Sequence, residues 1–316
     1  MTMKISGFSF VRNGIGLYYP VAESIKSILP VVDEFIIAVG EGSQGDKTRE
    51  EIAAIGDPKV KIIDTVWEEK YCKKGAINSV QTNIAKEACS GDWLFYLQAD
   101  EVVHEKYLPV IEKRCRDLIN NEDVEALIFR YKHFWGDYNH FQGGHGWYPH
   151  EIRIIRNRPD IHSWQSAQSF RRFDYFEHPR QPEGHYKLKA AEVDAEVFHY
   201  GWVRPPHLMQ NKRKALDSVH WGGKKAKEYY KKAPDYFDYG PLDLLEKFEG
   251  THPAVMEDMI SRFDWGDKLQ YSGKPDPGRE KHKHETLRCR ILSFIEKHFN
   301  GGKHIGEFKN YELLDV

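Results

Sequence analysis

The feature that most constrains this chain is an apolar stretch that ends abruptly in acidic residues. Residues 93–97, WLFYL, have the length and aromatic content of a buried strand, and Gln98-Ala99-Asp100-Glu101 follows directly. A carboxylate immediately after such a strand lies at the carboxyl edge of its sheet, where ligands bind in open α/β folds. Asp100 is therefore a candidate for holding a divalent cation, which would neutralise a diphosphate.

Around this strand, segments of strand and helix character alternate. Strand-like segments cover 4–11, 34–39, 60–63 and 93–97, and segments with helical spacing cover 19–29, 46–55 and 78–88. This alternation predicts an α/β fold with a mostly parallel central sheet flanked by helices.

Beyond Asp100 the pattern changes, and we expect the chain to divide near residue 204. The patterns predict a helix at 105–119, strands at 126–134, 151–156 and 193–200, and a long loop at 136–149. Helical regions are expected at 208–232 and 280–299. The sequence thus predicts a catalytic core over 1–204 and a mainly helical extension over 205–316.

The composition excludes several functional classes. Lys and Arg number 46 against 48 Asp and Glu, a net charge of −2, which is unlike the basic balance of nucleic-acid-binding domains. No apolar run approaches the ~20 residues that span a bilayer. The four cysteines form no CxxC pair, and the N-terminus enters a strand-like segment without a signal-peptide pattern. We therefore expect a cytoplasmic protein, although the basic and aromatic run at 224–239 is a candidate for peripheral membrane contact.

Several ordered segments resemble the family 2 glycosyltransferases of the GT-A fold. The resemblance covers about two thirds of the chain and rests on Val11-Arg12-Asn13-Gly14, residues 34–43 (EFIIAVGEGS), Asp46-Lys47-Thr48, Asn83, residues 91–101, and Phe198-His199-Tyr200. It implies a hexosyltransferase that moves a sugar from a nucleoside diphosphate donor, such as a UDP- or GDP-sugar, to a glycan or glycoconjugate acceptor, with inversion. Bacterial polysaccharide biosynthesis is the expected setting.

The resemblance also implies roles for individual residues. Asp100 and His199 would bind Mn²⁺ or Mg²⁺, and Asp100 would also serve catalysis. The nucleotide sugar would contact Arg12, Asn13, Glu41, Asn83, Gln98 and Asp100. Arg204 and Lys212 follow His199 and would reach the diphosphate.

Two positions depart from the family pattern. Gln98 stands where the metal motif usually begins with Asp, which predicts weaker metal binding. Residues 164–168 (WQSAQ) contain no carboxylate where many inverting members carry a His-Glu pair. The general base is therefore open among Glu101, Glu151, Asp174 and Glu177, and Glu151 is our choice because it begins the Arg-rich strand.

Three alternatives remain open from the sequence. A binding protein that has lost catalysis would also explain the missing carboxylates, and a nucleotidyltransferase would use a similar sheet and metal site. A zinc hydrolase would use His140, His145 and His150, whose five-residue spacing matches no zinc motif.

Overall fold

The computed structural model describes residues 3–306 and 308–316, and its first half alternates strands and helices. In chain order these elements are β1 (Ile5–Val11), α1 (Val21–Ile28), β2 (Glu34–Gly40), α2 (Thr48–Ala53), β3 (Val60–Thr65), α3 (Ala76–Glu87), β4 (Trp93–Tyr96), β5 (Glu101–Val103) and α4 (Leu108–Leu118). Strands then dominate, with β6 (Ala126–Trp135), β7 (His140–Gln142), β8 (His150–Arg156), β9 (Ile161–Trp164), β10 (Ser169–Phe173) and β11 (His185–Trp202).

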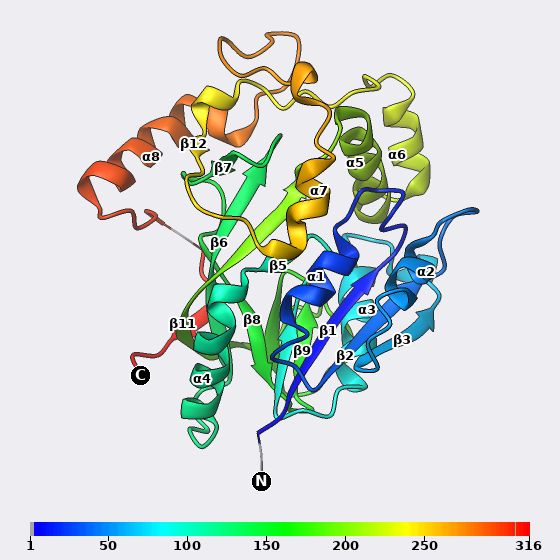
Figure 1. The fold of residues 1–316 in the computed structure, drawn as a ribbon, viewed down its shortest axis with the longest axis vertical. Helices are drawn as coiled ribbons and strands as arrows, with labels where there is room; N and C mark the ends of the chain where they lie inside the picture. The colour runs from blue at the N-terminus through cyan, green and yellow to red at the C-terminus, as the bar shows by residue number, and fades with distance from the viewer. Residues whose placement is uncertain (1–2, 307) are drawn as a thin grey trace.

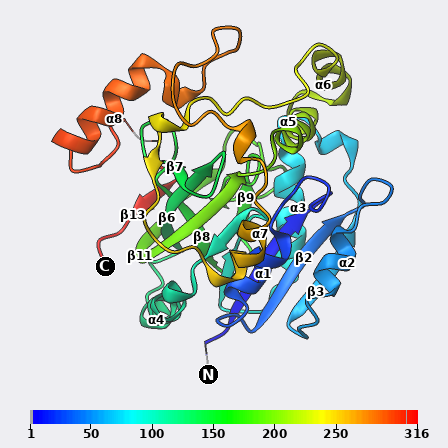
Figure 2. The same cartoon turned by 45° about the horizontal axis from the view of Figure 1, so that its top comes forward.

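The last third of the chain is largely helix and loop. It contains α5 (Pro206–Trp221), α6 (Gly223–Tyr230), β12 (Glu246–Lys247), α7 (Glu257–Ser261), α8 (Leu287–Phe299) and β13 (Tyr311–Leu313). Figures 1 and 2 show α5, α6 and α8 at the end of the molecule toward which β1 and β11 run. Among the described residues, no helix is long and apolar enough to cross a membrane.

The strands form one mixed sheet whose main path runs β3-β2-β1-β4-β8-β6-β11-β10-β9. Strands β1 to β4 pair in parallel, β8 is antiparallel to both of its neighbours, and β6 and β11 pair in parallel again. The predicted α/β class with a helix-flanked sheet is therefore confirmed. The parallel part is the half that carries the strand before Asp100.

Helices cover the two faces of the sheet unequally. On one face, α1, α2 and α4 contribute apolar side chains to a core that includes Ile25, Ile52, Ile111 and Phe95. On the other face, α3 packs beside β9 and β10 around Phe8. Because strands such as β2 are buried along their whole length, they read as continuous apolar runs.

The C-terminal third shares a core with the strand ends. A third apolar cluster joins Phe134, Phe198 and Tyr200 of the sheet to Met209, Tyr239 and other residues that follow. In addition, β12 pairs with β7, and β13 pairs with β11. The division at residue 204 stays a prediction, but the segments on either side of it pack together.

Several predicted elements differ from the structure. Strand β11 is 18 residues long rather than eight, and β5, β9 and β10 have no counterpart among the predicted elements. The loop expected at 136–149 contains β7, and the helix expected at 208–232 breaks at Gly222, where φ is 91°. The helix expected from Asp46 begins at Thr48, whose hydroxyl donates to Asp46 Oδ1. Such errors arise where pairing with distant strands, rather than local pattern, sets the conformation.

Candidate functional site

Asp100 and His199 meet at the carboxyl end of β4. Strand β5 begins just after Asp100 and runs antiparallel to β11, with Glu101 opposite His199. The amide of Tyr200 donates to the carbonyl of Asp100 at 2.8 Å. This pairing sets His199 Nε2 3.7 Å from Asp100 Oδ2, and both side chains are almost fully buried. The two residues predicted to hold a cation therefore face each other across neighbouring strands.

Gly201 leaves space around this pair. A Cβ at position 201 would lie 2.7 Å from Asp100 Oδ2 and would also collide with His199 Nε2. Any residue larger than glycine would therefore fill the space between the carboxylate and the imidazole. A residue without a side chain there keeps that space open.

A second histidine fixes the tautomer of His199. Nε2 of His133 lies 2.9 Å from the carbonyl oxygen of Tyr148, so it must donate its proton there. Burial, followed by the nearby His199, lowers the pKa of His133 well below the ordinary value, so His133 is neutral and its Nδ1 is an acceptor. His199 Nδ1 lies 2.9 Å from that atom and must donate to it. In neutral His199, Nε2 therefore presents a lone pair toward Asp100, as in a metal-ligating imidazole.

Lys212 of α5 supplies a cation to the same carboxylate. Its Nζ donates to Asp100 Oδ2 at 2.9 Å and to the carbonyl oxygen of Gly201 at 2.7 Å. Burial lowers the pKa of Lys212 to about 8, with Arg204 adding to the decrease and Asp100 opposing it. Burial raises the pKa of Asp100, but Lys212, together with His199 in its protonated form, outweighs it and holds that pKa well below the ordinary value. Asp100 is therefore ionised.

Arg204 brings a further positive charge beside this ion pair. It is fully buried, and Nε and Nη2 have no hydrogen-bond partner within the described residues. Its guanidinium lies 4.8 Å from the ring centre of Tyr19, and Lys212 Nζ lies at the same distance from that ring. With Asp100 negative and two cations present, this buried cluster has excess positive charge and unused donors, which complements an anion.

A hollow lies at the ends of β2 and β3. It has a volume of 440 Å³ and is lined by residues 39–43, Asp46, Arg49, Glu50 and residues 64–66. Arg12 Nε donates to the carbonyl oxygen of Glu41 at 2.8 Å, and the amide of Ser43 donates to Asn13 Oδ1 at 2.7 Å. Glu41 thus lines the hollow, and Arg12 and Asn13 lie beside it through their contacts with Glu41 and Ser43; their binding of a nucleoside stays a prediction.

Two other predicted ligand-binding residues make internal contacts. Gln98 Nε2 donates to the carbonyl oxygen of Ala167 at 3.0 Å, and Asn83 Oδ1 accepts from the amide of Ser163 at 2.8 Å. Gln98 therefore ties the end of β4 to the loop between β9 and β10. In that loop Gln165 and Ala167 have φ of 55° and 62°, a conformation that costs non-glycine residues energy and clusters at functional sites.

The four candidate bases lie in different environments. Glu151 is buried, with its carboxylate accepting from Ser169 Oγ at 2.8 Å and Asn310 Nδ2 at 2.7 Å, and burial raises its pKa despite nearby Arg153. Glu101 is sealed in an ion pair with Arg153. Asp174 and Glu177 are exposed. No hydrogen bond or ion pair found among the described residues joins any of the four to the Asp100 side chain.

The three loop histidines do not form a zinc site. His140 Nδ1 contacts Asp137 at 2.9 Å, and His145 Nδ1 contacts Glu296 at 2.7 Å, so the rings turn to different partners. Within the described residues, no group of three or more His, Cys, Asp or Glu side chains is arranged to hold a metal. The zinc alternative is therefore wrong.

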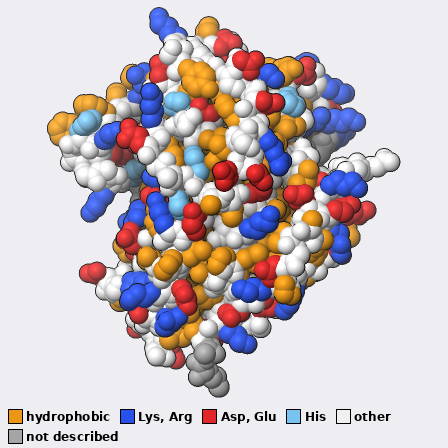
Figure 3. Space-filling model, in the orientation of Figure 1, with side chains coloured by type: hydrophobic (Ala, Val, Ile, Leu, Met, Phe, Trp, Pro, Cys, Tyr) orange, Lys and Arg blue, Asp and Glu red, His pale blue; other side chains and the backbone are white. Residues whose placement is uncertain are grey.

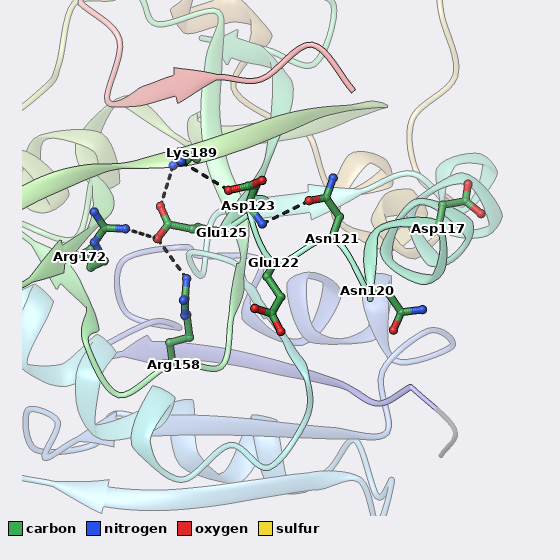
Figure 4. Close-up of a pocket in the computed structure, with 9 residues that line it drawn as sticks. All are labelled: Asp117, Asn120, Asn121, Glu122, Asp123, Glu125, Arg158, Arg172 and Lys189. Atoms are coloured by element: carbon green, nitrogen blue, oxygen red, sulfur yellow. Dashed lines mark hydrogen bonds and ion pairs between the residues drawn. The ribbon is translucent and has the colours of Figure 1, made fainter.

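A larger hollow of 830 Å³ lies at the opposite end of the sheet, where β6 begins (Figure 4). At its centre Glu125 accepts from Arg172 at 2.7 Å, from Arg158 at 3.2 Å and from the amide of Lys189 at 2.9 Å. Asp123 pairs with Lys189 in the same hollow. The cations of this hollow therefore pair with its own carboxylates, Arg158 and Arg172 with Glu125 and Lys189 with Asp123, unlike Arg204 beside Asp100.

Comparison with known proteins finds only remote structural likeness. No family model matches the chain, and no curated protein sequence matches it. Glucosyl-3-phosphoglycerate synthase from Mycobacterium tuberculosis, solved with Mn²⁺, UDP and glucosyl-3-phosphoglycerate, aligns at 20% identity over 41% of this chain and 44% of that chain, with a TM-score of 0.30. The same enzyme solved with Mg²⁺ and UDP gives a TM-score of 0.29 at the same identity and coverage.

A second solved structure, described only as a mycobacterial protein, aligns at 17% identity over 41% of each chain, with a TM-score of 0.28. The chain thus spans less than half the length of the structures it matches. A likeness of this extent does not identify the substrates of this chain.

The sequence does not predict the contact of His133 with His199 or that of Lys212 with Asp100. His133 belongs to a predicted strand, and it meets His199 because the two residues are opposite each other in the β6–β11 register. Lys212 was expected to reach a diphosphate, but its contact with Asp100 spans 112 positions. No local motif marks either residue.

Proposed function

We propose that this protein is a metal-dependent glycosyltransferase that moves a sugar from a nucleoside diphosphate donor to a glycan or glycoconjugate acceptor with inversion. The observation that carries the proposal is the buried cluster at the end of β4, where Asp100 Oδ2 and His199 Nε2 face each other beside Lys212 and Arg204. The nearby hollow at the ends of β2 and β3 supports a nucleoside position. Bacterial polysaccharide biosynthesis is the setting we propose.

The donor set fits Mn²⁺ or Mg²⁺. Asp100 offers a carboxylate oxygen, His199 an oriented nitrogen, and Gly201 leaves space beside both. Two protein ligands suffice where diphosphate oxygens and water complete the coordination. When bound, the ion would act as a Lewis acid that neutralises the diphosphate leaving group. Lys212 contacts the same oxygen of Asp100, so cation binding would require this lysine to move away.

The chain's own residues would then orient and stabilise the donor. Arg204 has two buried nitrogens for which the described part of the chain offers no acceptor, and Lys212, once released from Asp100, has hydrogen-bond donors available. Both would donate to phosphate oxygens as negative charge develops on the leaving diphosphate. Arg12, Asn13 and Glu41 would hold the base and ribose at the β2 end, while Gln98 would keep the Ala167 loop in place.

For inversion, the acceptor hydroxyl forms the new bond to the anomeric carbon as the bond to the diphosphate breaks, and its proton passes to a general base. We propose Glu151 as this base because burial raises the pKa of its carboxyl group. We expect Glu151→Gln to lower turnover ~10²–10⁴-fold with unchanged donor affinity. Unchanged turnover, with a lower melting temperature, would assign Glu151 to the core.

The deciding experiment is thermal unfolding of the purified chain against nucleotides and nucleotide sugars, with Mn²⁺ and then with EDTA. A ligand at ~100 times its Kd stabilises the folded state by about 2.7 kcal/mol. We expect one UDP- or GDP-sugar to raise the melting temperature, and EDTA to remove the shift. Release of a nucleoside diphosphate then shows transfer, whereas pyrophosphate from a triphosphate would show a nucleotidyltransferase. No shift with any nucleotide would contradict the proposal and favour a binding protein.

A further inference from the structure

Helix α8 exposes an apolar face that the rest of the chain leaves uncovered. Its large exposed side chains are Leu287 (71%), Ile291 (49%), Phe294 (58%), Ile295 (36%) and Phe299 (77%). At about 3.6 residues per turn, this spacing places them along one side of the helix. Figure 1 shows α8 projecting at one edge of the molecule, and Figure 3 shows hydrophobic side chains at that edge.

The opposite side of α8 is fixed to the body of the protein. Glu296 is buried and contacts His145 Nδ1 at 2.7 Å and the amide of Ile305 at 2.7 Å. Ser293 Oγ accepts from the amide of His145 at 2.9 Å. These contacts set the rotation of the helix, so the phenylalanines face outward because the polar side is held inward.

The charges that α8 itself carries beside its apolar face are positive, and one of them, Lys297, pairs with Glu246 Oε1 at 3.5 Å. Arg290 and Lys297, seven residues apart, lie on one flank, and Arg288 lies near the opposite edge of the apolar arc, whose centre also holds His298; all four are exposed. Between 281 and 303 the chain has six cations, Lys281, Lys283, Arg288, Arg290, Lys297 and Lys303, and two acids, Glu285 and Glu296. Both acids are buried. The exposed side of α8 therefore combines aromatic and aliphatic side chains with basic flanks.

We propose that α8 docks on the surface of an anionic lipid membrane, with its apolar face in the headgroup region and its basic flanks on lipid phosphates. An apolar centre between basic edges is the arrangement by which helices lie in a bilayer interface. A second copy fits less well, because twofold pairing through α8 would set Arg288, Arg290 and Lys297 against the same cations. The proposal rests on α8 alone and is independent of the proposed activity.

The test is co-sedimentation of the full 316-residue chain with vesicles of phosphatidylcholine, with and without phosphatidylglycerol. We expect binding only to the anionic vesicles, and weaker binding at raised salt. Arg290→Gln with Lys297→Gln should weaken it about 25-fold, or about fivefold for each cation. Phe294→Ser with Phe299→Ser should abolish it. Thermal melts confirm that each variant is folded.

A matched control changes the exposed face of α4, where Val110→Ser and Lys113→Gln alter one apolar and one basic residue; binding should persist. Absence of binding to anionic vesicles would overturn the proposal, as would α8 variants that bind like the unaltered chain. Concentration-dependent dimerisation that the Phe294→Ser and Phe299→Ser changes remove, without vesicle binding, would assign the face to a second copy instead.

Discussion

Two neighbouring carboxylates, Asp100 and Glu101, are both buried, yet their surroundings differ. Glu101 accepts two hydrogen bonds from Arg153, each 2.7 Å long, and a third from Tyr131, so its oxygens are fully engaged. Asp100 instead contacts Lys212, a single flexible cation, and faces Nε2 of His199. A planar guanidinium that holds both oxygens fixes a carboxylate, whereas an ammonium on a flexible stem can be displaced.

The comparison separates a buried carboxylate whose charge is paired within the fold from one that we propose binds ligands. Burial alone does not distinguish them, since Glu101 is fully buried and Asp100 nearly so. The two sites differ in whether hydrogen-bond donors near the carboxylate lack an acceptor. Around Glu101 and Arg153 the charges are paired, whereas beside Asp100 two nitrogens of the Arg204 guanidinium have no acceptor among the residues that the structure describes. We therefore expect changes at Glu101 to affect folding and changes at Asp100 to affect ligands.

The largest effect should come from breaking the buried ion pair between Glu101 and Arg153. Arg153→Met leaves Glu101 as an uncompensated buried charge, and we expect the free energy of unfolding to fall by about 3–5 kcal/mol. Denaturant unfolding measures the change. Adding Glu101→Gln to the same chain should recover part of the loss, because the stranded charge is removed. A loss below ~1 kcal/mol in the single variant would mean that the pair is not structural.

Changing the other carboxylate should destabilise the fold less than breaking the Glu101–Arg153 pair, because Lys212, whose pKa burial lowers to about 8, can lose its proton when Asp100 no longer carries a charge. Asp100→Asn keeps the shape but removes the charge, and we expect Mn²⁺-dependent affinity for the donor to fall more than ~100-fold, beyond the loss typical of outer-shell changes. Calorimetric titration with Mn²⁺ and a nucleoside diphosphate measures it. Unaltered affinity would remove Asp100 from the site.

A smaller effect should follow from replacing His133, whose Nδ1 contacts Nδ1 of His199. His133→Phe removes the acceptor for His199 Nδ1, so Nε2 no longer has a fixed lone pair. We expect metal affinity to fall ~10–100-fold. His133→Gln, whose amide oxygen can accept the same proton, is the matched control and should retain most of the affinity. Equal losses in both variants would argue that packing, rather than the tautomer, matters.

The smallest effect concerns the competing cation. Lys212→Met removes the ammonium from Asp100, so we expect affinity for Mn²⁺ alone to rise roughly tenfold, since opposed charges at such a distance are worth more than ~1 kcal/mol. Affinity for the diphosphate should fall at the same time, because one of its donors is lost. Metal affinity that stays the same would show that Lys212 does not compete with the cation.

Much of the core follows from local pattern. The continuous apolar run of β4 and the alternation of strands with helices predict the parallel half of the sheet, and a strand that ends in Asp100 places that carboxylate at the ligand edge. The short strands β9 and β10 could not be predicted from local pattern. They form because β9 pairs with β10 and β10 pairs with the long β11. Strand preference depends on such neighbours more than on the residues themselves.

Local sequence pattern accounts for the α/β class, the position of Asp100 at a strand end, and the polar residues that follow the first two strands, Arg12 and Asn13 after β1 and Glu41 after β2. The tertiary structure decided what surrounds Asp100. His133 meets His199 through strand register, and Lys212 arrives from a helix 112 positions away. The periodicity of apolar residues and the ends of strands depend on neighbouring residues, so they can be predicted from the sequence. The state of a buried charge depends on partners that only folding brings within hydrogen-bonding distance.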